Sequence, residues 1–150
     1  MDKSPILIPV NYPDPDFKVT RVRGKQIIRD VIRKKDIILT PEEWVRQNFI
    51  QYLIQVLKYP ASLFSIEKEI RLPALTKRCD IVVYRDAKPW MIIECKEPKV
   101  TINQKVLQQI LTYNMALQTP FLVLTNGPRT YAIERAGSTW QYLSALPKWA

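Results

Sequence analysis

Two short apolar segments that follow each other along the chain place three charged residues where buried strands are expected. The segments read CDIVVYR, residues 79–85, and WMIIECK, residues 90–96. Asp80 lies in the first segment, and Glu94 and Lys96 lie in the second. Ionised side chains are almost never fully buried unless they are paired or bind a metal. These three residues are therefore a candidate site.

The three side chains together suit hydrolysis of phosphodiester bonds with the help of a metal. Mg²⁺ takes oxygen ligands, commonly one or two carboxylates with water and substrate phosphate, and Asp80 and Glu94 offer such ligands. Mn²⁺ is expected to substitute. Residues two apart on a strand face the same side, so the Lys96 ammonium should lie beside Glu94 and orient the nucleophile or stabilise the reacting phosphate. A purely structural ion-pair cluster is the alternative interpretation.

A shared metal also constrains the hairpin that joins the two segments, because Asp80 and Glu94 must lie on one face of it. Pairing Arg85 with Trp90 across a four-residue loop would put the two carboxylates on opposite faces. We therefore expect a loop with an odd number of residues, either 85–89 or 87–89, or a β-bulge that restores the register.

Two helices are expected around the segments. The first, over about residues 41–58, begins at Thr40-Pro-Glu-Glu43, which is a helix-start signature. The second, over about residues 102–118, begins at a capping box, Thr101 to Gln104. Its apolar residues keep helical spacing at Val106, Leu107, Ile110, Leu111 and Leu117. Further strands are expected near residues 64–72, 121–126 and 130–135, with a turn at Gly127-Pro128 and a hairpin within residues 17–38.

These motifs resemble the PD-(D/E)XK nuclease superfamily, whose signature is an acidic residue on one strand and an acidic-x-Lys on the next. Gln109-x-x-x-Tyr113 matches the Q-x-x-x-Y of the RecB-like branch, and residues four apart on a helix can reach one ligand. Segments within residues 40–135 resemble the N-terminal nuclease domain of type I restriction-enzyme R subunits, which also occurs in small stand-alone proteins. These segments are TPEEWVRQNFIQYLI, RCDIVVYRD, IIECKEP, QQILTYN and LVLTNG.

The resemblance implies roles for three more residues. Gln109 and Tyr113 would contact DNA or brace the catalytic lysine, although a tyrosine on an amphipathic helix also suits a core. Glu43 would join the metal site, whereas its position three residues after Thr40 equally suits helix capping. The implied fold is an α/β, restriction-endonuclease-like core, with a mixed sheet flanked by helices in the order α-β-β-β-α-β and an N-terminal extension.

Charge favours a nucleic-acid partner, since Lys and Arg outnumber Asp and Glu by 23 to 14 and the net charge is +9. DNA is the expected substrate, with RNA left open. Lys77 and Arg78 precede Asp80 and are expected to contact phosphates, whereas the basic run 29–35 suits a solvated face equally well. The absence of histidine excludes Ser-His hydrolases and His-metal nucleases, and three glycines cannot build a phosphate-binding P-loop.

We expect one domain over residues 1–150, with an arm and hairpin at 1–40, a core at 41–135 and a tail at 136–150. The N-terminal residues lack a signal peptide, and no apolar run reaches membrane-spanning length. A cytoplasmic protein without a membrane partner is expected, with Cys79 and Cys95 reduced. The oligomeric state is left open, with a homodimer as one alternative.

The sequence thus predicts a Mg²⁺-dependent deoxyribonuclease of restriction or DNA-processing type. The alternative is a nucleic-acid-binding accessory protein that keeps the fold with little or no turnover. A junction- or transfer-RNA-processing enzyme would use the same metal site.

Overall fold

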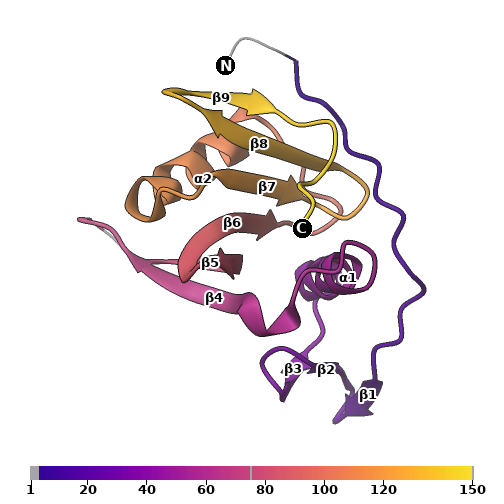
Figure 1. Ribbon diagram of the computed structural model, residues 1–150. Helices are drawn as coiled ribbons and strands as arrows, with labels where there is room; N and C mark the ends of the chain where they lie inside the picture. Colours follow the sequence, from indigo (N-terminus) through magenta and orange to yellow (C-terminus); the bar gives the residue numbers. More distant parts are fainter. Residues whose placement is uncertain (1–3, 75, 150) are drawn as a thin grey trace.

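The computed structural model describes residues 4–74 and 76–149. It contains a six-stranded sheet in the order β4-β5-β6-β7-β8-β9 and a separate three-stranded sheet, β1-β2-β3 (Figure 1). The elements are β1 (Val19–Val22), β2 (Lys25–Asp30), β3 (Lys35–Ile38), α1 (Pro41–Gln55), η1 (Ala61–Leu63), β4 (Phe64–Arg71), β5 (Thr76–Arg85), β6 (Lys88–Cys95), α2 (Gln104–Leu117), β7 (Phe121–Thr125), β8 (Thr130–Ala136) and β9 (Thr139–Tyr142).

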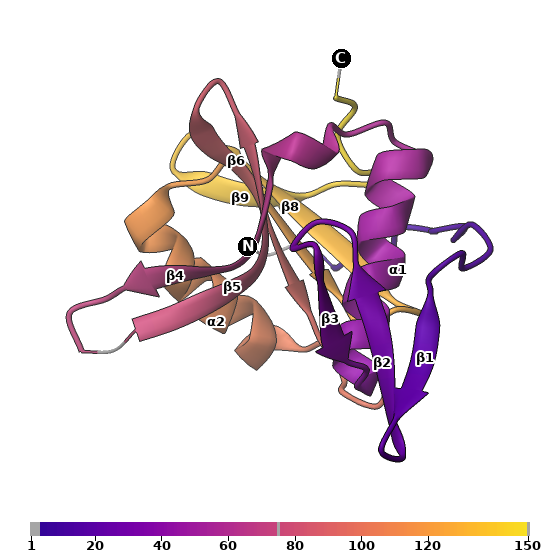
Figure 2. The same cartoon turned by 90° about the horizontal axis from the view of Figure 1, so that it is seen from below.

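The large sheet is mixed. Its neighbouring strands are antiparallel except for β6 and β7, which are parallel and are joined through α2. A parallel pair needs a crossover connection of this length. The two helices cover opposite faces of this sheet (Figures 1 and 2). The predicted α/β class, with a mixed sheet between helices, is therefore confirmed.

Alternation along the central strands explains why both faces are covered. Ile81 and Ile93 belong to the apolar cluster that contains the α1 residue Phe49. Val82 and Ile92, one residue away on the same strands, belong to the cluster that contains the α2 residue Ile110. Successive strand residues point to opposite faces, so continuous apolar runs predict strands buried on both sides.

The N-terminal region departs from the expected single hairpin. Residues 4–18 have no regular secondary structure, as expected, but residues 19–38 form three antiparallel strands. The first turn uses Arg23 and Gly24, both with positive φ, and this turn type suits a two-residue hairpin. The small sheet lies against α1 (Figure 2), and the irregular arm runs along the side of the molecule from β8 and β9 toward β1 (Figure 1). There the Ile8 amide donates to the Thr130 carbonyl at the start of β8.

Two other boundaries differ from the sequence prediction. Helix α2 begins at Gln104 and is capped by Asn103, whose side-chain oxygen accepts from the Val106 amide at 3.2 Å. The predicted capping box at Thr101 was wrong, because the helix begins only at Gln104 and Asn103 is its N-cap. The predicted tail contains β9, which extends the sheet beyond residue 135 after a turn at Gly137, where φ is +64°.

The start of α1 is as predicted. Thr40 is its N-cap, with its hydroxyl oxygen accepting from the Glu43 amide at 3.1 Å, and proline follows at the first helical position. The helix ends at Gln55, slightly before the predicted end. Within the part of the chain that the structure describes, no helix has the length and apolar character needed to cross a bilayer.

The revised cap of α2 gives a testable difference between two neighbouring residues. Asn103→Ala should lower the free energy of unfolding by about 1 kcal/mol, because the Val106 amide loses its acceptor. Thr101→Ala should change stability by less than about 0.5 kcal/mol, as expected for an exposed side chain away from the cap. Urea unfolding of both variants measures this. A larger loss at Thr101 than at Asn103 would restore the predicted capping box.

Candidate active site on the central strands of the main sheet

The register of the β5–β6 hairpin decides whether Asp80 and Glu94 share a face. Arg85 pairs with Lys88, so the loop consists of Asp86 and Ala87 alone. Both loop residues have positive φ, 54° and 62°, which matches the tight turn typical of two-residue hairpins. The predicted loop with an odd number of residues is therefore wrong.

A bulge restores the register, as the alternative prediction required. The pairing shifts between Val83 and Tyr84, which leaves Trp90 as an extra residue on β6. Beyond this bulge, Ile81 pairs with Ile93, and the next position along each strand opposes Asp80 to Glu94. Without the extra residue, the register of the turn would oppose Asp80 to Ile93. The bulge at Trp90 is therefore what brings the two carboxylates to one face.

Both carboxylates are buried, with only 8% of each residue exposed. Asp80 Oδ2 accepts a hydrogen bond from the Cys95 amide at 2.7 Å. Glu94 Oε1 lies 3.7 Å from the Lys96 ammonium nitrogen. Glu94 Oε2 is buried and has no hydrogen-bond partner within residues 4–74 and 76–149. A buried charged oxygen without a partner is costly, and such an atom is suited to a bound cation.

Burial also changes the protonation of the pair. Burial, and after it the negative charge of Asp80, raise the pKa of Glu94 from an ordinary 4.5 to about 8. Burial likewise raises the pKa of Asp80 to about 6, although the Cys95 amide and the Arg46 charge oppose that rise. Two like charges side by side in a poorly solvated site cannot both ionise easily. The pair therefore keeps a proton near neutral pH unless a cation replaces it.

Helix α1 contributes Arg46, which the sequence analysis did not select. Its Nη1 donates to the Asp80 carbonyl at 3.4 Å and lies 3.9 Å from Asp80 Oδ1. That carbonyl is accessible because the β4–β5 pairing skips Glu67 and Asp80, where Glu67 has a φ of +57°. The strand irregularity thus opens Asp80 toward α1. A signal was present in the sequence, since Arg46 lies three residues before Phe49 and four before Ile50, and these spacings share a helix face.

Glu43 lies in a network of ion pairs on the same helix. Its Oε1 accepts from Arg33 at 3.0 Å, and its Oε2 accepts from Gln47 at 3.0 Å and lies 3.1 Å from Arg46 Nε. Its backbone amide is part of the Thr40 cap. Among the described residues, no group of three acidic, cysteine or histidine side chains is arranged to hold a metal. The structure therefore places Glu43 among cations and does not bring it together with the two strand carboxylates.

The neighbouring Glu42 acts on the carboxylate pair instead. Its negative charge raises the pKa of both Asp80 and Glu94, after the larger effect of burial. Glu42 is exposed in the first turn of α1, whereas Glu43 is buried. The sequence offered both glutamates after Thr40, and choosing between them required the rotation of the helix about its axis.

The residues expected to bind DNA or brace the lysine lie at different places. Tyr113 is buried on α2, and the Lys77 ammonium lies over its ring at 5.0 Å from the centroid. The Tyr113 hydroxyl raises the pKa of Lys77, and the charges of Glu94 and Asp80 add to this rise. Thus Tyr113 contacts Lys77 at the site. Gln109 is exposed on the same helix, and Arg78 is exposed with a 3.9 Å contact to Glu67.

The raised pKa of Glu94 predicts a pH-dependent stability. A carboxyl whose pKa is higher in the folded state stabilises the fold fully below its unfolded value of about 4.3. This contribution is lost as the pH rises toward about 8. Glu94→Gln should therefore melt above the wild-type protein by at least about 3 °C at pH 9, with little difference at pH 4. Thermal melts without divalent ions measure this.

The exposed Glu69 on β4 provides the matched control. Glu69→Gln should follow the wild-type melting temperature across the same pH range. If Glu94→Gln melted below the wild-type protein at pH 9, the carboxyl would be stabilising in its ionised form. The burial argument would then be wrong.

Comparisons with known proteins identify a family for most of the chain. A family model described as the N terminus of type I restriction enzyme R proteins matches residues 41–147. Among solved structures, the chain is similar to a protein from Anabaena variabilis ATCC 29413 that was described as a candidate nuclease belonging to DUF820. The two are 14% identical, the match covers 88% of this chain and 79% of that one, and the TM-score is 0.47. The comparison with curated proteins found no match. The family model matches more than half of the residues of this chain. The chain therefore belongs to the family of type I restriction enzyme R protein N termini.

Proposed function

We propose that this chain is a Mg²⁺-dependent nuclease that hydrolyses phosphodiester bonds in DNA, in restriction or DNA processing. The observation that carries the proposal is that the register of β5 and β6 sets Asp80 opposite Glu94, one position beyond the Ile81–Ile93 pair. This pairing depends on a bulge, and it buries two like charges beside the Lys96 ammonium. Strained or destabilising arrangements of this kind cluster at functional sites. Membership of a restriction-enzyme family supports the same reading.

The donor set fits a hard divalent cation. Asp80 Oδ1 and the unpartnered Glu94 Oε2 are carboxylate oxygens, which Mg²⁺ and Mn²⁺ prefer to nitrogen or sulfur. The charge of Glu42 acts on this pair, but Glu42 does not form a three-carboxylate ligand group with it among the described residues. When bound, such an ion would supply positive charge that neutralises the phosphate and lowers the pKa of a water molecule. The high pKa of Glu94 would then fall, because a cation stabilises the ionised form.

The lysines would complete the site from two sides. Lys96 extends from the end of β6 and holds its ammonium 3.7 Å from Glu94, so it can donate to a phosphate oxygen as charge develops there. Lys77 approaches from β5 and is oriented by the Tyr113 ring. Exposed Arg78 lies one residue from it and can meet a flanking phosphate. The net charge of +9 favours association with a polyanion.

One observation favours a second candidate function, a DNA-binding accessory protein without useful turnover. The Arg46 guanidinium lies 3.9 Å from Asp80 Oδ1, an oxygen that a metal would need as a ligand. A buried cation at this distance already neutralises part of the negative charge that a metal requires. In this reading, Arg46 keeps Asp80 occupied, and the basic surface binds nucleic acid without cleavage.

A cleavage assay separates the two functions. Purified protein with Mg²⁺ or Mn²⁺ should cleave linear, circular or branched DNA. Asp80→Asn and Glu94→Gln should lower the rate at least about 100-fold, because each removes a charged ligand oxygen. Lys96→Met should cause a loss of about 100-fold through the missing ammonium. Lys99→Met, at an exposed lysine in the β6–α2 loop, is the matched control and should keep the wild-type rate.

The binding of the same DNA supplies the second readout. In EDTA, the wild-type protein should still bind DNA with an affinity that falls steeply as salt increases. Salt-sensitive binding with no cleavage under either metal would support the accessory function. Cleavage that persists unchanged in Asp80→Asn and Glu94→Gln would contradict the proposed site.

A further inference from the structure

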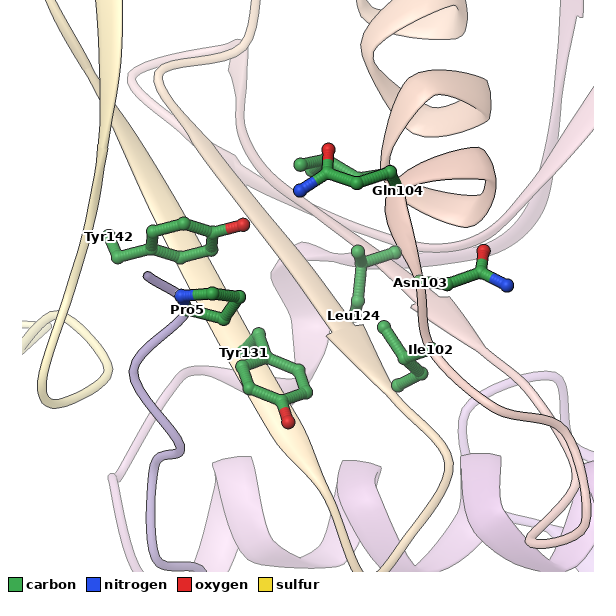
Figure 3. A pocket seen from close by; sticks show the side chains of 8 residues that line it. Pro5, Ile102, Asn103, Gln104, Leu124, Tyr131 and Tyr142 are labelled. Atoms are coloured by element: carbon green, nitrogen blue, oxygen red, sulfur yellow. The ribbon is translucent and has the colours of Figure 1, made fainter. Parts of the chain in front are cut away.

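A cavity of about 270 Å³ opens between the start of α2 and strands β7, β8 and β9 (Figure 3). Tyr131 on β8 and Tyr142 on β9 form one side of it, and Leu124 on β7 lies between them and the helix. Pro5 of the N-terminal arm lies at the same space. The carboxylate site does not use these side chains, and the sequence analysis did not select them.

The register of the sheet places this cavity beside the carboxylate site. Glu94 pairs with Leu124 across β6 and β7, and Leu124 pairs with Tyr131 across β7 and β8. Paired residues on neighbouring strands project to the same face. Two strand spacings of about 4.8 Å put Tyr131 about 10 Å from Glu94 along one row. The cavity therefore lies on the α2 side of the sheet, next to the proposed cleavage site.

The chemistry of the walls selects a flat and uncharged ligand. None of the described residues that line the cavity carries a charge, so neither a phosphate nor a metal ion finds a partner there. Two tyrosine rings offer surfaces on which a planar group can stack. The Gln104 amide faces the space on the side of Tyr142, whereas the Asn103 side chain points away from it (Figure 3). An amide can donate and accept at once, as the edge of a nucleobase requires.

We propose that this cavity binds one unpaired nucleobase of the substrate, next to the phosphate that a divalent cation on Asp80 and Glu94 would hold. The inference rests on the proposed nuclease function and names its substrate class. The volume suits a single ring system, since pockets for larger ligands begin at roughly 300 Å³. A base inside a duplex cannot enter such a cavity without leaving the stack. The preferred substrate is therefore DNA with an unpaired or extruded base beside the cleaved bond.

Nucleoside binding tests the cavity without any catalysis. In EDTA, adenosine or thymidine should shift the amide NMR signals of Gln104, Leu124 and Tyr131. Tyr131→Ala should weaken this binding about 10-fold through the lost stacking surface. Tyr84→Ala, at another partly buried tyrosine on β5, is the matched control and should bind as the wild-type protein does. Gln104→Ala, at an exposed position that keeps the fold, should change the ratio between the two affinities.

Cleavage supplies the second arm. A duplex with one unpaired nucleotide should be cleaved with a kcat/KM about 10-fold above that of the same duplex with an abasic residue there. Tyr131→Ala should abolish this difference, and Tyr84→Ala should keep it. Nucleoside binding without any cleavage would support the binding cavity and contradict the proposed nuclease activity. Cleavage at equal rates for the unpaired and the abasic duplex would contradict the cavity proposal alone if nucleosides also caused no NMR shifts at the cavity. Equal loss of nucleoside binding in Tyr131→Ala and Tyr84→Ala would contradict it in the same way.

Discussion

The burial of two carboxylates side by side is the constraint on which the rest of the site depends. Asp80 and Glu94 lie on adjacent strands within a sheet covered on both faces, so water cannot solvate either charge fully. Nothing in the apolar packing requires this pair, and its raised pKa values indicate a cost to the fold at neutral pH. The cost is understandable if binding a cation to the pair offsets it, which is the usual relation between stability and a functional site.

A relay of charged contacts links the small N-terminal sheet to this pair. Fully buried Asp30 on β2 holds Arg33 at 2.6 Å, Arg33 contacts Glu43 on α1, and Glu43 contacts Arg46, which reaches Asp80. Each of these side chains orients the next one. Removing the Asp30 carboxylate should therefore alter the position of the Arg46 guanidinium beside Asp80. The N-terminal region therefore belongs to the support of the site, although its sequence predicted only an arm and a hairpin. Buried ion pairs of this kind fix geometry more reliably than they add stability.

The sequence predicted the central strands, both helices and the juxtaposed carboxylates, because short apolar runs with embedded charges and helical spacing are local signals. Two arrangements could place Asp80 and Glu94 on one face, a loop with an odd number of residues or a bulge. The sequence did not choose between them, since the register depends on a turn geometry that composition does not specify. Asn103 replaced Thr101 as the cap because two residues of similar capping propensity lie in one loop. Arg46 and Glu42 were missed because their role depends on the rotation of α1 against the sheet. Such tertiary relations carry no fixed spacing in a sequence.

The most direct test of the account is the location of a divalent ion. Crystals grown with Mn²⁺ should give an anomalous scattering peak between the carboxylates of Asp80 and Glu94, about 2.0–2.3 Å from an oxygen of each. The peak should vanish in crystals of Glu94→Gln. The account would be contradicted if Mn²⁺ bound elsewhere, or nowhere, while the Arg46 guanidinium stayed at the Asp80 carboxylate.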